Sequence, residues 1–178
     1  MGAHCDSPQH RFYLLTKQQL NLPKFNPFPK NAWVGVSLTH YTDNTVSNFR
    51  GLSECDAKVR FVSLEPLLGS LQHLDFLNRL MEGINWVIIG AMTCGGGEIA
   101  KLSSKYPGLT PMPYSNRYTL QPKIEWMEEI MRAADKAGVK VFLKDNLRPL
   151  LVDALFKGVI SRKQFFNDRE LRQELSGD

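Results

Sequence analysis

The chain has 178 residues, of which 43% are hydrophobic and 22% are charged, a composition typical of a folded globular protein. Its apolar runs, such as residues 86–90, are too short to cross a bilayer, and no charged segment followed by an apolar one opens the chain. We therefore expect neither a membrane protein nor a secretory signal. The formal net charge of +4 permits an anionic partner without requiring one, because basic residues are scattered among acidic ones.

We expect a single domain over residues 1–178, with residues 1–10 poorly ordered. Five short runs of β-branched, aromatic and aliphatic residues predict buried strands. In chain order, the predicted strands are residues 12–16, 32–38, 58–64, 84–91 and 139–143.

Helical patterns separate most of these strands, because apolar residues recur in them at helical spacing and glycines close three of them. A helical turn at residues 18–22 precedes an ordered loop at 23–31, which contains three prolines. The predicted helices are residues 42–52, 70–81, 122–137 and 147–157.

Two segments lack a strong period. Residues 92–121 are rich in proline and glycine, and a connection of this length predicts a lid or binding loop. Residues 161–178 form a charged tail, in which the pattern permits a short helix over 168–175.

Buried strands separated by helices or long connections are the signature of βα units and a parallel sheet. The pattern predicts an α/β fold. It fits either an open parallel sheet of about five strands with flanking helices or a partial (β/α) barrel of the TIM type. In both, functional groups collect at the carboxyl ends of the strands.

Polar side chains follow the predicted strands where each one ends. Glu65 stands out because it ends an apolar strand directly before Pro66, and an ionisable group there is costly unless it is paired or functional. Lysines at the same rim would form an ion-paired cluster with it. The alternative is that these groups only satisfy one another and nearby loop backbone. The candidate pocket residues are Lys17, Ser37, Glu65, Lys144 and Asp145.

The three cysteines, Cys5, Cys55 and Cys94, are widely spaced and include no C-x-x-C pair. This spacing does not support a zinc or iron–sulfur site built from local cysteines, and the four histidines lack metal-binding spacing. We therefore expect no metal site. Three thiols without a disulfide framework are typical of a reducing compartment, which predicts a cytoplasmic protein.

The motifs FYLLTK, WVGVS, VRFVSLEPLLG, INWVIIG and VFLKDNL resemble, in this order, those of a group of phage, bacterial and archaeal proteins. That group is labelled a domain of unknown function of the phage Gp type and looks related to radical S-adenosylmethionine (SAM) enzymes. The resemblance runs from about Pro8 to the end. In the full-length barrels a C-x-x-x-C-x-x-C motif would hold a [4Fe–4S] cluster that cleaves SAM to a radical.

This chain has no such cysteine motif, which implies a barrel fragment that does not itself perform radical chemistry. SAM and the [4Fe–4S] cluster are then cofactors of a full-length relative. By position, the resemblance implies that Ser37 contacts the ribose or methionine part of SAM and that the backbone at Gly90 approaches the adenine. It also makes Glu65 and Lys144 polar pocket residues. The stretch AMTCGGGE after Gly90 departs from the glycine-glycine-glutamate ending usual in the family.

Two other interpretations stay open. Lys144 ends an apolar strand, and with Glu65 nearby it could act as the Schiff-base lysine of an aldolase-like barrel. A non-catalytic, phage-associated protein that binds nucleic acid would instead gather its basic residues on one face. The basic residues in question are Arg50, Lys58, Arg60, Lys101, Lys105 and Arg117.

A partial barrel also leaves strand edges and apolar faces uncovered, which is a liability for a protein in water. We expect either the chain's own loops or a second copy in a homodimer to cover them. The small molecule that the rim would bind is not specified by the residues themselves.

Overall fold

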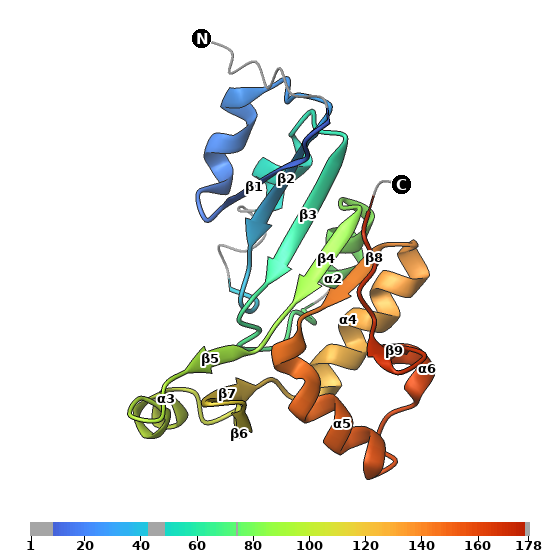
Figure 1. Cartoon of the computed structure of the whole chain (residues 1–178). Helices are drawn as coiled ribbons and strands as arrows, with labels where there is room; N and C mark the ends of the chain where they lie inside the picture. Colours follow the sequence, from blue (N-terminus) through green and yellow to red (C-terminus); the bar gives the residue numbers. More distant parts are fainter. Residues whose placement is uncertain (1–8, 43–48, 74, 177–178) are drawn as a thin grey trace.

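The computed structural model describes residues 9–42, 49–73 and 75–176. Five strands form one parallel sheet in the order β1-β2-β3-β4-β8 (Figure 1). This confirms the predicted α/β fold, and each predicted strand is present with its ends shifted slightly. The strands are β1 (Phe12–Thr16), β2 (Ala32–Ser37), β3 (Val59–Leu64), β4 (Trp86–Ile89) and β8 (Lys140–Leu143).

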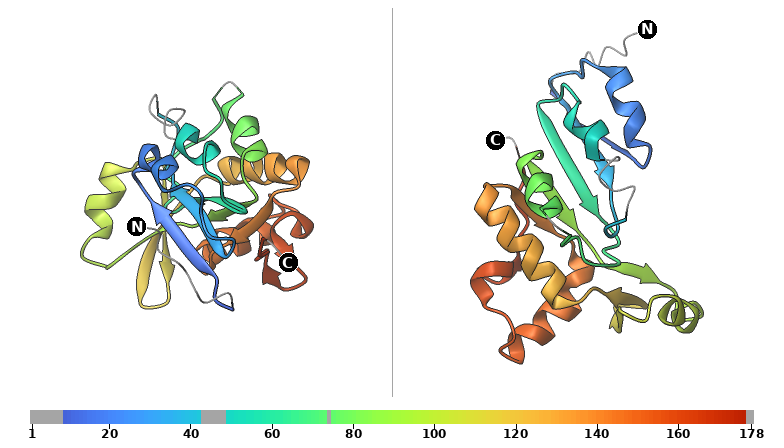
Figure 2. Two further views of the ribbon diagram at one scale, coloured as in Figure 1. Left: turned by 90° about the horizontal axis from the view of Figure 1, so that it is seen from above. Right: turned by 180° about the vertical axis from the view of Figure 1, so that it is seen from behind.

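Helices cover one face of this sheet. The helices α2 (Phe76–Glu82) and α4 (Ile124–Ala137) lie behind the sheet in Figure 1 and in front of it in Figure 2 (right). Their apolar side chains join alternate strand residues, such as Val62 and Leu64, in the main core. The predicted glycine stop of α4 is observed, because Gly138 takes a left-handed conformation with φ of 69°.

The opposite face of the sheet carries a layer of aromatic side chains, which we call the aromatic face. Trp33, Phe61 and Trp86 form its centre and are 3%, 2% and 5% exposed. The Tyr13 ring lies 5.2 Å from that of Trp33. Gly35 makes the layer possible, because a Cβ at that position would overlap the Phe61 ring. The aromatic side chains at the centre of this face are thus largely buried against one another.

Residues 92–121 do not form the loop that the sequence predicts. They contain α3 and a three-stranded antiparallel sheet, in which the central strand β7 pairs with both β5 and β6. Figure 1 shows this unit, which we call the arm, projecting beyond the carboxyl ends of the parallel sheet. Its elements are β5 (Met92–Cys94), α3 (Ile99–Lys105), β6 (Thr110–Tyr114) and β7 (Arg117–Gln121).

Several helices begin or end at other residues than the sequence predicts. The predicted helix over 70–81 begins only at Phe76, although Leu71 is buried in the core as a non-helical residue. Of the predicted helix over 42–52, residues 49–53 are helical and 43–48 lie outside the described residues. The turn predicted near residue 18 is a 3₁₀ helix, η1 (Gln19–Phe25). The last predicted helix is observed as η2 (Asp145–Leu147) followed by α5 (Arg148–Phe156).

The charged tail contains no helix over 168–175. Instead, α6 (Arg162–Phe165) leads into a short hairpin of β9 (Phe166–Asn167) and β10 (Glu170–Leu171). Residues 172–176, which we call the C-terminal strap, then run along the outer edge of β8 (Figure 1). Most of residues 1–10, for which we predicted disorder, lie outside the described part of the chain.

The strap is held by backbone and side-chain hydrogen bonds. The Leu143 N–H donates to the Arg172 carbonyl at 2.8 Å, and the Glu174 N–H donates to the Val141 carbonyl at 2.8 Å. The indole N–H of Trp86 also donates to the Glu174 carbonyl at 2.8 Å. The chain therefore covers the β8 edge with its own C-terminal residues.

Candidate functional site at the carboxyl edge of the sheet

The register of the parallel strands places four of the residues singled out from the sequence on one face of the sheet. Ser37 pairs with Ser63, which lies on the same face of β3 as Phe61 because side chains alternate along a strand. Beyond the strand ends the ladder continues, since the Gly90 N–H donates to the Leu64 carbonyl at 3.1 Å. Ser37, Glu65, Gly90 and Lys144 therefore lie on the aromatic face, at its carboxyl edge.

Glu65 and Lys144 form an ion pair at this edge. The Lys144 Nζ lies 2.6 Å from the Glu65 Oε1, and their side chains are 41% and 30% exposed, so the pair borders solvent. The sequence predicted that Glu65 and Lys144 would come together, and the structure brings them together.

Gly90 explains how Glu65 reaches Lys144. Strand β4 separates β3 from β8, so the Glu65 side chain must pass over the end of β4. A Cβ at position 90 would lie 3.0 Å from the Glu65 Cγ and 3.1 Å from its Oε1, which is tighter than ordinary van der Waals contact. At Gly90, where the family resemblance implies a close approach to adenine, the Glu65 side chain lies against the backbone.

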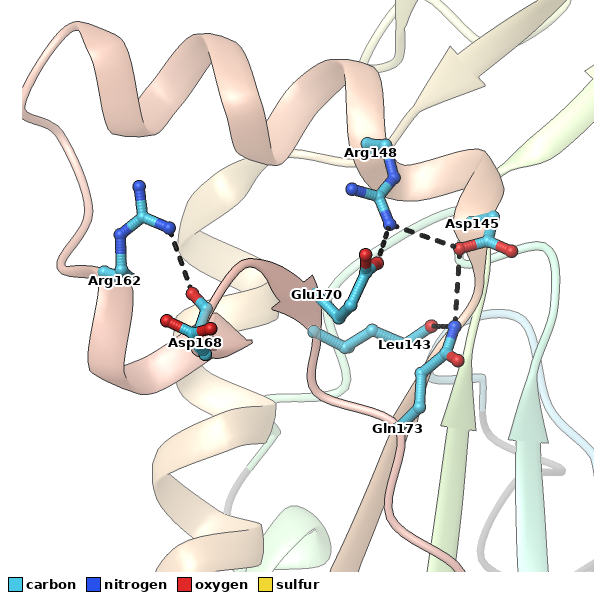
Figure 3. A network of polar contacts seen from close by, with 7 residues as sticks. All are labelled: Leu143, Asp145, Arg148, Arg162, Asp168, Glu170 and Gln173. Atoms are coloured by element: carbon cyan, nitrogen blue, oxygen red, sulfur yellow. Dashed lines mark hydrogen bonds and ion pairs between the residues drawn. The ribbon is translucent and has the colours of Figure 1, made fainter.

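Lys17 and Asp145 lie apart from the ion pair. Lys17 is exposed at the end of β1, and β2 separates that strand from β3. Asp145 faces the C-terminal region: its Oδ1 accepts from the Gln173 Nε2 at 3.4 Å and lies 3.7 Å from the Arg148 guanidinium (Figure 3). Figure 3 also shows Arg148 bridging to Glu170, at 2.7 Å. Asp145 therefore belongs to the network that holds the C-terminal hairpin.

A buried polar network joins the arm to the same edge. Asn146 clamps Ala91, because its Nδ2 donates to the Ala91 carbonyl at 2.8 Å and its Oδ1 accepts from the Ala91 N–H at 3.1 Å. Gln121, at the end of the arm, donates to the Asn146 carbonyl at 2.7 Å. Asn146 lies two residues after Lys144 in the sequence, but no local pattern marks Gln121. The network fixes the root of the arm beside the loop that presents Lys144.

The described cysteines are buried thiols. Burial raises the pKa of Cys55, with Glu54 acting in the same direction and Arg60 opposing it. Burial also raises the pKa of Cys94, and Glu98 adds to the effect. In the described ranges no group of three or more His, Cys, Asp or Glu residues is arranged to hold a metal ion, and Cys5 lies outside those ranges.

The basic residues of the nucleic-acid interpretation fall into two groups. Lys58 and Arg60 lie at the amino end of β3, and Arg50 is paired with Glu54 at 2.7 Å in the helix that precedes this strand. The others lie in the arm, at the opposite end of the sheet in Figure 1. The six side chains therefore do not gather on one face.

A groove of about 580 Å³ lies elsewhere, between α4 and α5. Its walls include Trp126 and Glu129 from α4, Asp153 from α5 and Lys157, which directly follows α5. None of the candidate pocket residues predicted from the sequence lines this groove. None of the helices in the described part of the chain combines the length and apolar character needed to span a bilayer.

The protein family described as a protein of unknown function (DUF5131) matches residues 3–103. The chain belongs to the DUF5131 family. The match covers more than half of the chain and includes β1 to β4 with Ser37, Glu65 and Gly90, whereas β8 and Lys144 lie beyond it. Comparisons with curated proteins and with solved structures gave no match.

Proposed function

We propose that this DUF5131 protein supplies one wall of a small-molecule site in a radical SAM-like barrel, at the carboxyl edge of its parallel sheet. The ion pair of Glu65 and Lys144 on the aromatic face is the observation that carries the proposal. It is supported by the layering of the sheet, since the helices of the described residues pack on one face and the aromatic side chains lie on the other. In a (β/α) barrel, helices lie outside and functional side chains stand at the carboxyl ends of the strands.

The charges at this edge suit the methionine part of SAM. Glu65 offers a carboxylate that accepts hydrogen bonds from an ammonium group, and Lys144 offers an ammonium group that donates to a carboxylate. The ammonium and carboxylate groups of the methionine part would bind Glu65 and Lys144, respectively. These two contacts replace the one that the side chains make with each other. Ser37, on the same face two strands away from Gly90, supplies a hydroxyl for a ribose.

The described residues do not fit an iron–sulfur cluster. Cys55 is buried, and its Sγ donates to the Gly51 carbonyl at 3.1 Å. Cys94 lies in the arm, beyond the carboxyl ends of the parallel strands. Cluster ligation needs several thiolates that converge on one point. We therefore assign these residues a role in binding SAM and derive no step of radical chemistry from them.

Thermal unfolding and calorimetry with SAM and S-adenosylhomocysteine test the proposal. We expect SAM to raise the melting temperature of the wild-type chain, and Glu65→Gln and Lys144→Met each to abolish the rise. Lys157→Met is the matched control, because it removes a lysine from another ion pair, with Nζ 2.8 Å from Asp153, on α5. An equal response in all four proteins, or no response at millimolar SAM, would sink the proposal.

The alternatives receive less support. A nucleic-acid face would require the basic residues to gather, whereas they are divided between two ends of the sheet. A Schiff-base lysine must offer a neutral amine, whereas Lys144 is held in an ion pair with Glu65.

A further inference from the structure

The two edge strands of the parallel sheet, β8 and β1, differ in what pairs with their outer sides. The outer edge of β8 is paired with the C-terminal strap, through the bridge between Phe142 and Gln173. At the other side, β1 pairs with β2 alone among the described residues. The Phe12 N–H donates to the Asn31 carbonyl at 2.9 Å, so the backbone groups of alternate residues face β2. The backbone groups of Tyr13 and Leu15 consequently point outward from the sheet.

The side chains of β1 are also uncovered. Tyr13, Leu14 and Leu15 are 50%, 43% and 51% exposed, and because neighbouring residues point to opposite faces, both faces of the strand are partly open to solvent. In η1, which runs beside β1 in Figures 1 and 2, Leu20 and Phe25 are 61% and 66% exposed. We call these five residues the β1 surface. Apolar side chains gathered beside an open strand edge mark a site of protein association.

The stretch of sequence that forms β1 and η1 carries charge of one sign. Residues 7–42 contain no Asp or Glu but four basic residues, Arg11, Lys17, Lys24 and Lys30, which equal the net charge of +4 of the whole chain. A second copy would bring the same charges. In an antiparallel pair centred on Leu14, Arg11 would face Lys17 of the other copy, and like charges opposite one another are destabilising. The segment that fits this edge carries carboxylates.

We propose that β1 is the docking edge for an extended segment of another protein, which adds to the sheet as a further strand and carries acidic residues at its ends. Main-chain hydrogen bonds to Tyr13 and Leu15 hold the added strand, and its apolar side chains cover those of β1. The carboxylates at its ends pair with the basic flanks of the strand. This site shares no residue with the Glu65–Lys144 pair, so each proposal can fail without the other.

A synthetic peptide tests this directly. The probe is a fluorescein-labelled segment of alternating valine and threonine with two glutamates at each end, and its control carries lysines in place of the glutamates. Fluorescence polarisation with the full chain is expected to show the acidic peptide binding at least about tenfold more tightly, with an affinity that falls as salt is added. Equal binding of both peptides, or no binding of either, would overturn the proposal.

Two variants separate strand addition from mere apolar contact. Leu15→Pro removes an outward-facing N–H, which an edge strand tolerates, and Leu14→Lys places a charge on the β1 surface. Both should keep the wild-type melting temperature and lose about tenfold or more in peptide affinity. Phe156→Lys is the control, because Phe156 is 86% exposed on α5, and it should bind as the wild type does. Unchanged binding by Leu15→Pro excludes strand addition.

Other occupants give other results. A monomer–dimer equilibrium in sedimentation that Leu14→Lys abolishes would assign the β1 surface to a second copy. Binding of single-stranded DNA or of vesicles containing phosphatidylserine, with the same sensitivity to Leu14→Lys and without peptide binding, would assign it to a nucleic acid or a membrane. Either outcome overturns the proposal.

Discussion

Replacing Gly35 by alanine tests whether the aromatic face is a tightly packed layer. The new Cβ would overlap the Phe61 ring. Phe61 is 2% exposed, and its ring centroid lies 5.5 Å from that of Trp86, so the ring has little space into which to move. The backbone at Gly35 lies outside the left-handed region, so the backbone itself accepts alanine. The effect of the substitution therefore arises from packing.

The magnitude follows from two opposing contributions. Overpacking a core costs about 1–3 kcal/mol, while replacing glycine by alanine gains about 0.4–1 kcal/mol by reducing the entropy of the unfolded chain. The net loss in the free energy of unfolding is therefore about 0–2.6 kcal/mol. For a chain of this size, 1 kcal/mol corresponds to about 2–4 °C, so the melting temperature should fall by up to about 10 °C.

Scanning calorimetry and urea unfolding of matched variants measure this effect. Gly97→Ala is the control, because nothing lies within 4 Å of a Cβ at that position, and it should be neutral or slightly stabilising. Phe61→Leu should be less harmful in the Gly35→Ala background than in the wild type, because the smaller side chain relieves the overlap. The reasoning is refuted if Gly35→Ala is as stable as Gly97→Ala.

Three further predictions follow from the edge, the strap and the buried thiol. Gly90→Ala should displace Glu65 from Lys144 at a cost of about 1 kcal/mol or less, since the pair is partly exposed, yet calorimetry should show loss of SAM binding. Deleting residues 172–178 should expose Trp86 and the β8 edge, so that tryptophan emission shifts to the red and sedimentation detects self-association; unchanged emission would contradict the packing of the strap. Because burial raises the pKa of Cys55, its neutral thiol stabilises the fold fully below the unfolded pKa of about 8.5, and this contribution is lost as the pH rises through the higher folded value. Cys55→Ala should therefore flatten the alkaline fall in stability, and parallel curves for both proteins would count against this.

The parallel strands and the charged residues at their carboxyl ends could be predicted because each is marked by a local sequence pattern. Each parallel strand is an apolar run, and Glu65 and Lys144 are the charged residues that end two of them, so the topology brings them to one edge. The crossing of Glu65 over Gly90 could not be read from the sequence, because it depends on the order of β3, β4 and β8 in the sheet.

The arm and the strap escaped prediction for physical reasons. Strand β6 contains Pro111 and Pro113, which are unusual in strands but tolerated at the edge of the small sheet that β6 occupies. Helix α3 has no buried residue, so it shows no clear apolar stripe. The strap pairs with β8 through tertiary contacts such as the hydrogen bond from the Glu174 N–H to the Val141 carbonyl, and its charged residues resemble a solvated tail.

The most direct test of the central claim is a titration of the isotope-labelled chain with SAM, followed by the backbone amide signals in NMR spectra. We expect shifts that centre on Ser37, Glu65, Gly90 and Lys144 and that disappear in the Glu65→Gln variant. Shifts confined to the groove between α4 and α5, or no shifts at millimolar SAM, would contradict it.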